Sequence, residues 1–317
     1  MNIIIKKYLK ILFPIARSIT GKNNRLTLKI LKEIVPLKIK SIKSGSKVYD
    51  WRIPGEWEIK DAFIKDQDGN KILDYKKNNL SIMNYSTRIE KKIYWNELKK
   101  KIYKHPTLKK AIPYRTSYYQ KDWGFCVTDS QYNKLSKIKD KLNIKIDSKI
   151  NNNGKLNYGE LIIKGKYKKE ILISTYFCHP SMANDNLSGV IVTTFLAAFL
   201  KNKKNLKWTY RIIFIPETIG AIAYLNKNEK KLKNIDFGLN ICNCGGPGKF
   251  GYKQSWSKNH FINELVEKTF KTSKLNFKTY LFDINGSDER QYSSPAFRIN
   301  MITICKDKYY EFPQYHN

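Results

Sequence analysis

The sequence predicts an α/β fold with a three-layer core, in which a mostly parallel sheet carries helices on both faces, and with an inserted β-rich domain. From residue 170 onward, apolar β-branched runs alternate with helical patterns, as they do where helices connect parallel strands. Residues 46–125 differ, because they are rich in Trp, Tyr, Pro and Asp-Gly. With 317 residues and 41% hydrophobic content, the chain can bury a large core and a second unit. We therefore expect residues 1–45 and 126–317 to form the core and 46–125 the insertion.

The N-terminal segment favours two helices. Residues 1–21 superficially resemble a signal peptide, but Lys6, Lys7 and Lys10 interrupt the apolar run and no small-residue cleavage site follows. We expect an amphipathic helix of the domain itself there. A second helix is predicted over 26–35, where apolar residues recur three and four positions apart.

The insertion favours antiparallel strands. Asp68-Gly69 lies between two runs of alternating character, which is a strong hairpin signal because the tight turn needs residues that tolerate left-handed backbone. After the insertion, residues 129–142 favour a short helix and residues 156–163 favour a strand.

The rest of the chain alternates regularly between strands and helices. Strands are expected at 170–175, 209–215, 236–242, 278–283 and 299–305, and helices at 187–201, 218–229 and 259–272. The carboxyl ends of parallel strands meet at one edge of a sheet, so the loops that follow these strands are expected to share a crevice.

The loops after three of these strands carry the residues best suited to chemistry. In CHPSMANDNLSG, Asp185 follows His179 by six residues, while Glu217 comes after the second strand and His316 after the last. Imidazole and carboxylate ligands suit zinc, and three protein ligands leave one position for water. We predict one zinc ion held by His179, Asp185 and His316, with Glu217 as the general base for the attacking water.

Nearby residues are assigned supporting roles. Tyr292 or Arg290 is predicted to stabilise an oxyanion. The residues expected to support the ligands or their turns are Asn184, Asn186, Asp288 and Glu289. A structural alternative stays open for the main candidates: His179 and His316 as hydrogen-bonded core histidines, and Glu217 as a carboxylate at a helix start.

Other conspicuous residues are interpreted as structural. His105 is expected at the surface and His260 near a helix cap. Cys178 suggests a thiol nucleophile, but neighbours in an extended segment point to opposite faces, so Cys178 beside His179 is expected to be a small buried residue. The run GGPG at 245–248 lacks the spacing of phosphate-binding loops and is expected to form a tight turn.

The charge of the chain suggests an acidic partner at first. The formal net charge is +33, which invites a nucleic-acid interpretation. However, only eight of the 60 basic residues are arginine, and the lysines are spread along the chain together with Asn and Ile. That trio is typical of an AT-rich genome. We therefore expect solvated lysine faces and a small-molecule or peptide-like substrate, with nucleic acid as an unfavoured partner.

Two further features bear on location. No apolar run approaches the length that spans a bilayer. The five cysteines are odd in number and lack the spacing of a disulfide framework, which is typical of a reducing compartment. A cytoplasmic location is expected.

Several motifs together resemble a known family. These are LFPIARSITG, SGSKVYDWRIPGEW, IPYRTSYYQKDWGFC, CHPSMANDNLSG, FIPETIG, DERQYSSP and FPQYH. They are similar to bacterial proteins with an aminopeptidase-like domain, the DUF4910 family with its DUF2172 insertion, over residues 10–317. The loop ANDNLSG also resembles the GADDNASG loop of the M28 zinc aminopeptidases. The resemblance implies a phosphorylase/hydrolase-type core, and members of the group are often labelled as polysaccharide-biosynthesis proteins.

The resemblance also implies roles for individual residues. Asp185 matches the metal-bridging aspartate, Glu217 the general base and His316 the late ligand, while His179 matches the early ligand approximately. The two-zinc enzymes have further metal ligands, and this chain has Thr218 at the position of one of them. The aspartate of the His-x-Asp motif is absent, and the loop after strand 236–242 offers only Asn243 and glycines.

The expected function follows from these matches and departures. The chain is predicted to be a zinc-dependent hydrolase that cleaves an amide or peptide-like bond, with one ion and a doubtful second ion. The alternative is a catalytically degenerate peptidase fold that serves as a binding or accessory protein in polysaccharide biosynthesis.

Overall fold

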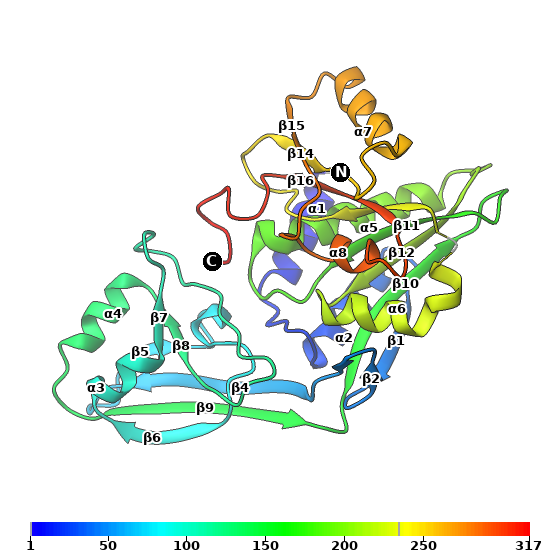
Figure 1. Cartoon of the computed structure of the whole chain (residues 1–317). Coiled ribbons are helices and arrows are strands. Elements are labelled where there is room, and N and C mark those ends of the chain that lie inside the picture. The colour runs from blue at the N-terminus through cyan, green and yellow to red at the C-terminus, as the bar shows by residue number, and fades with distance from the viewer. Residues whose placement is uncertain (1, 234) are drawn as a thin grey trace.

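The larger unit of the molecule is built on one eight-stranded sheet. The computed structural model describes residues 2–233 and 235–317. The strands of the sheet are β1 (Lys38–Lys43), β10 (Lys155–Ile163), β11 (Glu170–Tyr176), β12 (Thr209–Ile215), β13 (Phe237–Ile241), β14 (Phe250–Lys253), β15 (Phe277–Tyr280) and β16 (Asn300–Lys306). Their order is β1-β10-β12-β11-β13-β16-β14-β15 (Figure 1). The four central strands β12, β11, β13 and β16 are parallel, which confirms the predicted α/β class.

Helices cover both faces of this sheet. They are α1 (Asn2–Leu12), α2 (Lys22–Lys32), α5 (Gly189–Lys201), α6 (Ile219–Leu232), α7 (Phe261–Thr272) and the short α8 (Glu289–Tyr292). Strand β12 shows how the layers arise, because its side chains alternate between faces. Ile212 and Phe214 pack with α2 and α5, whereas Ile213 and Ile215 pack with α6. A strand buried on both faces needs a continuous apolar run, and TYRIIFI supplies one.

The smaller unit is an antiparallel sheet with short flanking elements. Its strands are β4 (Glu56–Lys65), β5 (Lys71–Asp74), β6 (Ile89–Ile93) and β9 (Leu142–Asn151), in the order β5-β4-β9-β6. The flanking elements are β7 (Ile102–Lys104), β8 (Phe125–Val127), α3 (Trp95–Leu98), α4 (Asp129–Ser136) and the 3₁₀ turns Asn79–Ser81 and Lys99–Lys101. A separate short hairpin, β2 (Lys47–Val48) and β3 (Trp51–Arg52), contacts α6 of the large unit (Figure 1). The hairpin between β4 and β5 turns at Gly69, whose φ is 84°.

The structure moves the boundary of the insertion beyond the predicted residue 125. Strand β9 pairs with β4 along its whole length, from Glu56 opposite Asn151 to Lys65 opposite Asn143. The predicted helix over 129–142 ends at Ser136, and this strand begins at Leu142. The small unit therefore continues to the end of β9, and β10 is the first strand that returns to the large sheet.

Two predicted elements near the C-terminus also differ. Strand β15 ends at Tyr280 rather than 283, and it is parallel to β14 while β14 is antiparallel to β16. The carboxyl end of β15 therefore does not lie at the edge shared by β11, β12 and β16. Strand β14 lies between the strand predicted at 236–242 and the helix predicted at 259–272, where no strand was predicted, because its four residues are too few to show a period.

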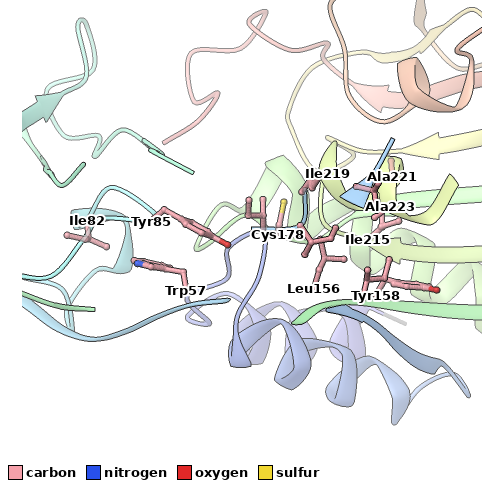
Figure 2. Packing of buried hydrophobic residues seen from close by; sticks show 14 of the residues in the cluster. Trp57, Ile82, Tyr85, Leu156, Tyr158, Cys178, Ile215, Ile219, Ala221 and Ala223 are labelled. Atoms are coloured by element: carbon pink, nitrogen blue, oxygen red, sulfur yellow. The ribbon is translucent and has the colours of Figure 1, made fainter. Parts of the chain in front are cut away.

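One buried cluster joins the two units. Figure 2 shows Trp57 and Tyr85 of the small unit on one side and Ile215 and Ile219 of the large unit on the other, with Cys178 between them. The rings of Trp57 and Tyr85 stack with centroids 5.7 Å apart. The Tyr85 hydroxyl donates a hydrogen bond of 3.1 Å to the carbonyl of Gly55. The units are therefore packed against each other through a shared core.

Helix α5 is the most apolar helix of the chain. The segment Ala183–Lys201 is long and apolar enough by composition to cross a membrane, and 56% of it is buried inside the structure. Its residues Val190, Ile191 and Ala197 belong to the core beside β11 and β13. The helix thus packs as a core element of this fold.

Replacing Gly189 with alanine is expected to destabilise the protein by about 1–3 kcal/mol, as overpacking does. A Cβ atom at Gly189 would lie 2.6 Å from the carbonyl oxygen of Ile241 and 2.9 Å from the Cα atom of Cys242, and backbone atoms of a central strand cannot move aside cheaply. Urea denaturation measures the change. The control is Val192→Ala on the exposed side of the same helix, expected within about 0.5 kcal/mol of wild type. Equal stability of the two variants would contradict the close helix–sheet contact.

Candidate metal centre

The loop after β11 begins at the carboxyl edge of the large sheet and carries the first candidate ligand. His179 is 4% exposed. Its carbonyl oxygen accepts a hydrogen bond of 2.9 Å from Arg17 Nε, and Arg17 Nη1 donates to the carbonyl of Leu12 at 2.6 Å. The buried guanidinium therefore ties the backbone of His179 to the N-terminal segment. Burial lowers the pKa of Arg17 to about 10.

The three predicted ligands lie close together in the structure. His179 Nδ1 lies 3.3 Å from Asp185 Oδ1, and His316 Nε2 lies 3.1 Å from Asp185 Oδ2. The imidazole rings of His179 and His316 are 5.4 Å apart. The hydroxyl of Tyr176, at the end of β11, donates to Asp185 Oδ1 at 2.6 Å. Asp185 is therefore the centre of the group, with one histidine at each carboxylate oxygen.

Glu217 joins this group from the neighbouring strand. It follows β12 by one proline, and its Oε2 atom lies 3.2 Å from His179 Nε2. Ser287 Oγ donates a hydrogen bond of 2.7 Å to Glu217 Oε1, and the backbone N–H of Glu217 donates to Cys178 Sγ at 3.3 Å. The Glu217 side chain is 25% exposed. It is thus the one carboxylate of the group that solvent reaches.

The electrostatics of the group follow from burial and charge. Burial disfavours the charged form of His179, but the neighbouring Asp185 outweighs it and raises the pKa of His179 well above its ordinary value. The pKa of Asp185 lies well below its usual range despite burial, because His179 and His316 both face it. Burial and then the charge of Glu217 raise the pKa of Asp288 well above its ordinary value.

The donor set fits a zinc ion. One ligand atom from each of His179, Asp185 and His316 lies within 4.8 Å of the others, a spacing comparable to twice a zinc–ligand distance of about 2.0–2.2 Å. His179 Nδ1 is buried and makes no hydrogen bond of acceptable geometry. A buried nitrogen without a partner calls for an ion or water. A second triplet, Cys178, His179 and Glu217, shares His179 with the first, so the two triplets compete for one side chain.

Asn184 and Asn186 shape the loop around Asp185. Asn186 Nδ2 donates to the carbonyl of Tyr176 at 2.8 Å, and its Oδ1 accepts from the Asn243 backbone N–H at 3.0 Å. Asn184 Oδ1 accepts from the Gly245 N–H at 2.8 Å. Both amides therefore bind backbone and hold the Asp185 loop against the turn after β13.

The backbone is strained at several positions beside these residues. Ser181, Thr218, Asn243 and His316 all have positive φ, at 24°, 59°, 50° and 58°. Non-glycine residues seldom adopt this region, and such outliers concentrate at functional sites. Both amide atoms of the buried Asn243 side chain lack a hydrogen-bond partner among the described residues.

The structure does not bring Tyr292 and Arg290 into contact with the His179–Asp185–His316 group. The Tyr292 hydroxyl is buried and hydrogen-bonds to Ser174 Oγ at 3.1 Å. Arg290 donates to the carbonyl oxygens of Ser287 and Ile284. These contacts correct the predicted oxyanion role, because a buried hydroxyl with a partner and a guanidinium bound to its own loop are not aimed at a substrate.

Asp288 and Glu289 support the site through backbone and a buried ion pair. Asp288 Oδ1 accepts a hydrogen bond of 2.7 Å from the backbone N–H of Thr218. Glu289 is fully buried, with Oε1 3.1 Å from Lys253 Nζ and Oε2 3.1 Å from Asn240 Nδ2. These contacts fix the loop that carries Ser287 toward Glu217. The loop therefore reaches the site although β15 runs away from the shared edge.

The other histidines and Cys178 have the surroundings that the sequence suggested. His105 is half-buried at the surface and accepts from the Leu108 N–H at 2.9 Å. His260 caps α7 by accepting from the Ile262 N–H. Cys178 is fully buried, and burial raises its pKa to about 12. A thiol with so high a pKa is not an activated nucleophile.

Four residues of the site were not predicted: Arg17, Tyr114, Tyr176 and Ser287. Tyr114 comes from the small unit, and its ring packs edge-on against His179 and His316, with centroids 5.2 and 5.5 Å away. Tyr176 directly follows the strand predicted at 170–175, so the strand-end argument that selected Glu217 could have included it. Arg17 and Tyr114 lie in two of the motifs quoted for the resemblance, but no local pattern shows what they contact.

Comparisons with known proteins agree with this architecture. The family model "Domain of unknown function (DUF4910)" matches residues 6–317. A Clostridium acetobutylicum protein named for polysaccharide biosynthesis and an aminopeptidase-like domain is 43% identical over 305 residues, covering 96% of this chain and 69% of that protein. The crystal structure of a candidate peptidase from Clostridium acetobutylicum is 42% identical, with a TM-score of 0.94 over 97% of this chain and 72% of that one.

More distant structures share the fold. A zinc aminopeptidase from Bacillus subtilis has a TM-score of 0.64 at 14% identity, covering 99% of this chain and 86% of its own. A peptidase M28 precursor from Shewanella amazonensis has a TM-score of 0.65 at 10% identity, covering 96% and 83%. The large unit therefore has a peptidase fold of the M28 type.

Proposed function

Because the chain belongs to the DUF4910 family and has a peptidase fold, we propose that it is a zinc-dependent hydrolase that cleaves an amide or peptide-like bond. The observation that supports this most directly is the convergence of His179, Asp185 and His316, with Glu217 3.2 Å from His179. Two imidazoles and a carboxylate form a three-ligand zinc set that leaves one position open.

The residues of the site have different roles in the proposed reaction. Zinc held by His179, Asp185 and His316 would polarise a carbonyl and acidify water. Glu217 is solvent-accessible, and Ser287 holds one of its oxygens, so Glu217 is placed to accept a proton from an attacking water and to return it to the leaving amine. Tyr176 fixes the orientation of Asp185 through its hydroxyl.

The cavity beside Asp185 suggests an apolar group in the substrate. It has a volume of about 730 Å³ and extends from Asp185 between α1 and α5. Its walls are mainly apolar, with Leu9, Ile191, Phe195 and Phe312 among them, and no Lys or Arg of the described residues lines it. In a chain with 60 basic residues, this favours an uncharged apolar side chain next to the scissile bond.

The number of ions and the setting are also part of the proposal. We infer one ion, because Thr218 and Asn243 stand where a second ion would need carboxylates. All five cysteines are free thiols, which supports a reducing, cytoplasmic setting. The name of the Clostridium acetobutylicum relative suggests a link to polysaccharide biosynthesis.

Metal analysis of the purified protein tests the proposal. Wild type should contain about one equivalent of zinc, and His179→Ala should contain less than about half, because one of three ligands is lost. His105→Ala is the matched control, since His105 belongs to neither possible metal-ligand group of the described residues, and it should keep the wild-type content. A wild-type content below half an equivalent that His179→Ala leaves unchanged would refute the zinc centre.

One observation favours the accessory-protein alternative. Thr218 and Asn243 stand at positions where a second zinc ion would need carboxylate ligands. The alternative predicts zinc without turnover. Hydrolysis of aminoacyl p-nitroanilides with apolar side chains separates the two, because release of nitroaniline that a chelator abolishes requires the hydrolase.

A further inference from the structure

The segment IPYRTSYYQKDWGFC belongs to the small unit, yet part of it lies at the metal centre of the large unit. Tyr114 is 8% exposed, and its ring edge contacts both histidines. Its backbone N–H donates a hydrogen bond of 2.7 Å to the carbonyl oxygen of His316. Tyr114 therefore holds His316 by backbone and ring and contacts His179 by its ring.

The segment is itself held rigidly. The Tyr114 hydroxyl lies 2.8 Å from the Tyr118 hydroxyl and 3.4 Å from Asn84 Nδ2. Asn84 Nδ2 also donates to the carbonyl of Arg17 at 3.3 Å, and Arg17 holds the backbone of His179. Tyr118 packs against Tyr85 with ring centroids 5.6 Å apart. A continuous series of contacts therefore connects Tyr85 of the shared core with His179 and His316.

We propose that Tyr114 is a positioning residue for the metal ligands, so that zinc affinity depends on the small unit. This inference rests on the proposed zinc centre. His316 needs such a support because its side chain is 35% exposed and its φ is 58°. The Tyr114 ring closes the side of both imidazoles that faces the small unit and prevents them from turning away from Asp185. Residues that orient ligands in this way change metal affinity without touching the ion.

The coupling is reciprocal. If the position of Tyr114 strengthens zinc binding, zinc must stabilise the placement of residues 112–118 by the same free energy. The small unit is therefore part of the metal centre in a thermodynamic sense, although it supplies no ligand.

The test compares zinc affinities by competition with a chromophoric chelator. Tyr114→Ala should bind zinc about 10-fold to 100-fold more weakly than wild type. Tyr114→Phe keeps the ring and the backbone hydrogen bond, so its affinity should stay within about 3-fold. Tyr119→Ala is the control in the same segment, because Tyr119 is 50% exposed and bonds only to the carbonyl of Arg52 among the described residues. It should match wild type.

A second measurement uses wild type alone and holds even if Tyr114→Ala does not fold. Hydrogen exchange of residues 112–118 should slow when zinc replaces excess chelator, because the Tyr114 N–H is bonded to His316. Unchanged exchange, an unchanged affinity in Tyr114→Ala, or an equal loss in Tyr114→Phe would each overturn the positioning role. A wild type that binds no zinc would instead overturn the proposed function itself.

Discussion

Replacing Glu217 by glutamine is expected to lower the rate of hydrolysis by about 10²-fold to 10⁴-fold, the range of general acid–base catalysis. Glutamine keeps the shape of the side chain and can still accept the hydrogen bond from Ser287 Oγ, but it cannot take a proton from water. The measurement is kcat on the aminoacyl p-nitroanilide that wild type turns over best, together with zinc content, which should not fall because Glu217 is outside the proposed ligand set.

Two variants make this experiment specific. Glu264→Gln on the exposed start of α7 is the matched control and should keep wild-type kcat. Ser287→Ala should lower kcat less than Glu217→Gln, since it removes one hydrogen bond and leaves the base. If Glu217→Gln were as active as wild type with zinc bound, the base would lie elsewhere. If wild type were inactive with zinc bound, this result would support the accessory-protein interpretation instead.

Replacing Lys253 by methionine is expected to lower the free energy of unfolding by about 3–5 kcal/mol, the range for removing one partner of a buried ion pair. Lys253 is 1% exposed and Glu289 is fully buried. Lys253 Nζ also donates to the carbonyl oxygens of Asp283 and Asn285 at 2.9 and 2.6 Å. Methionine fills the space, but leaves the Glu289 carboxylate and two carbonyls without their cation.

Urea denaturation with a matched set of variants measures this effect. Lys278→Met on β15 removes an exposed lysine whose partner Glu311 is also at the surface, so it should cost less than about 1 kcal/mol. The double variant Lys253→Met with Glu289→Met should be more stable than Lys253→Met alone, because no charge is then left buried. A loss below about 1 kcal/mol in Lys253→Met would show that the pair is dispensable.

The alternation of strands and helices after residue 170 was sufficient to predict the parallel centre of the large sheet. Strand β12 has the predicted bounds because its apolar run is continuous, as a strand buried on both faces requires. The end of the insertion could not be predicted from apolar runs or from the alternation of strands and helices. Strand β9 alternates between apolar and polar residues, and its assignment to the small sheet depends on pairing with β4 about ninety positions earlier in the chain. Strand direction also depends on pairing. For this reason the sequence did not show that β15 runs opposite to the central strands.

The site also combines residues that local sequence patterns predict with residues that only the packing of distant segments brings there. His179, Asp185, Glu217 and His316 follow strands that end at one edge, so topology alone places them near each other. Tyr292 and Arg290 follow the same rule in sequence, but the short helix α8 turns the Tyr292 ring into the core. Tyr114 reaches the site from the small unit, and only the packing of the two units determines that contact.

The pairing of β1 with β10 has a consequence for chain entropy. Lys43 lies opposite Lys155, so the large sheet must close a loop that contains the whole small unit. Once β4 and β9 are paired, Glu56 lies opposite Asn151, and the open loop shrinks from on the order of 100 residues to on the order of 10. The logarithmic dependence of closure entropy on length makes that difference worth roughly 2 kcal/mol. Formation of the small sheet therefore lowers the entropic cost of joining the N-terminal strand, and the folded insertion removes most of the closure cost that its own length imposes.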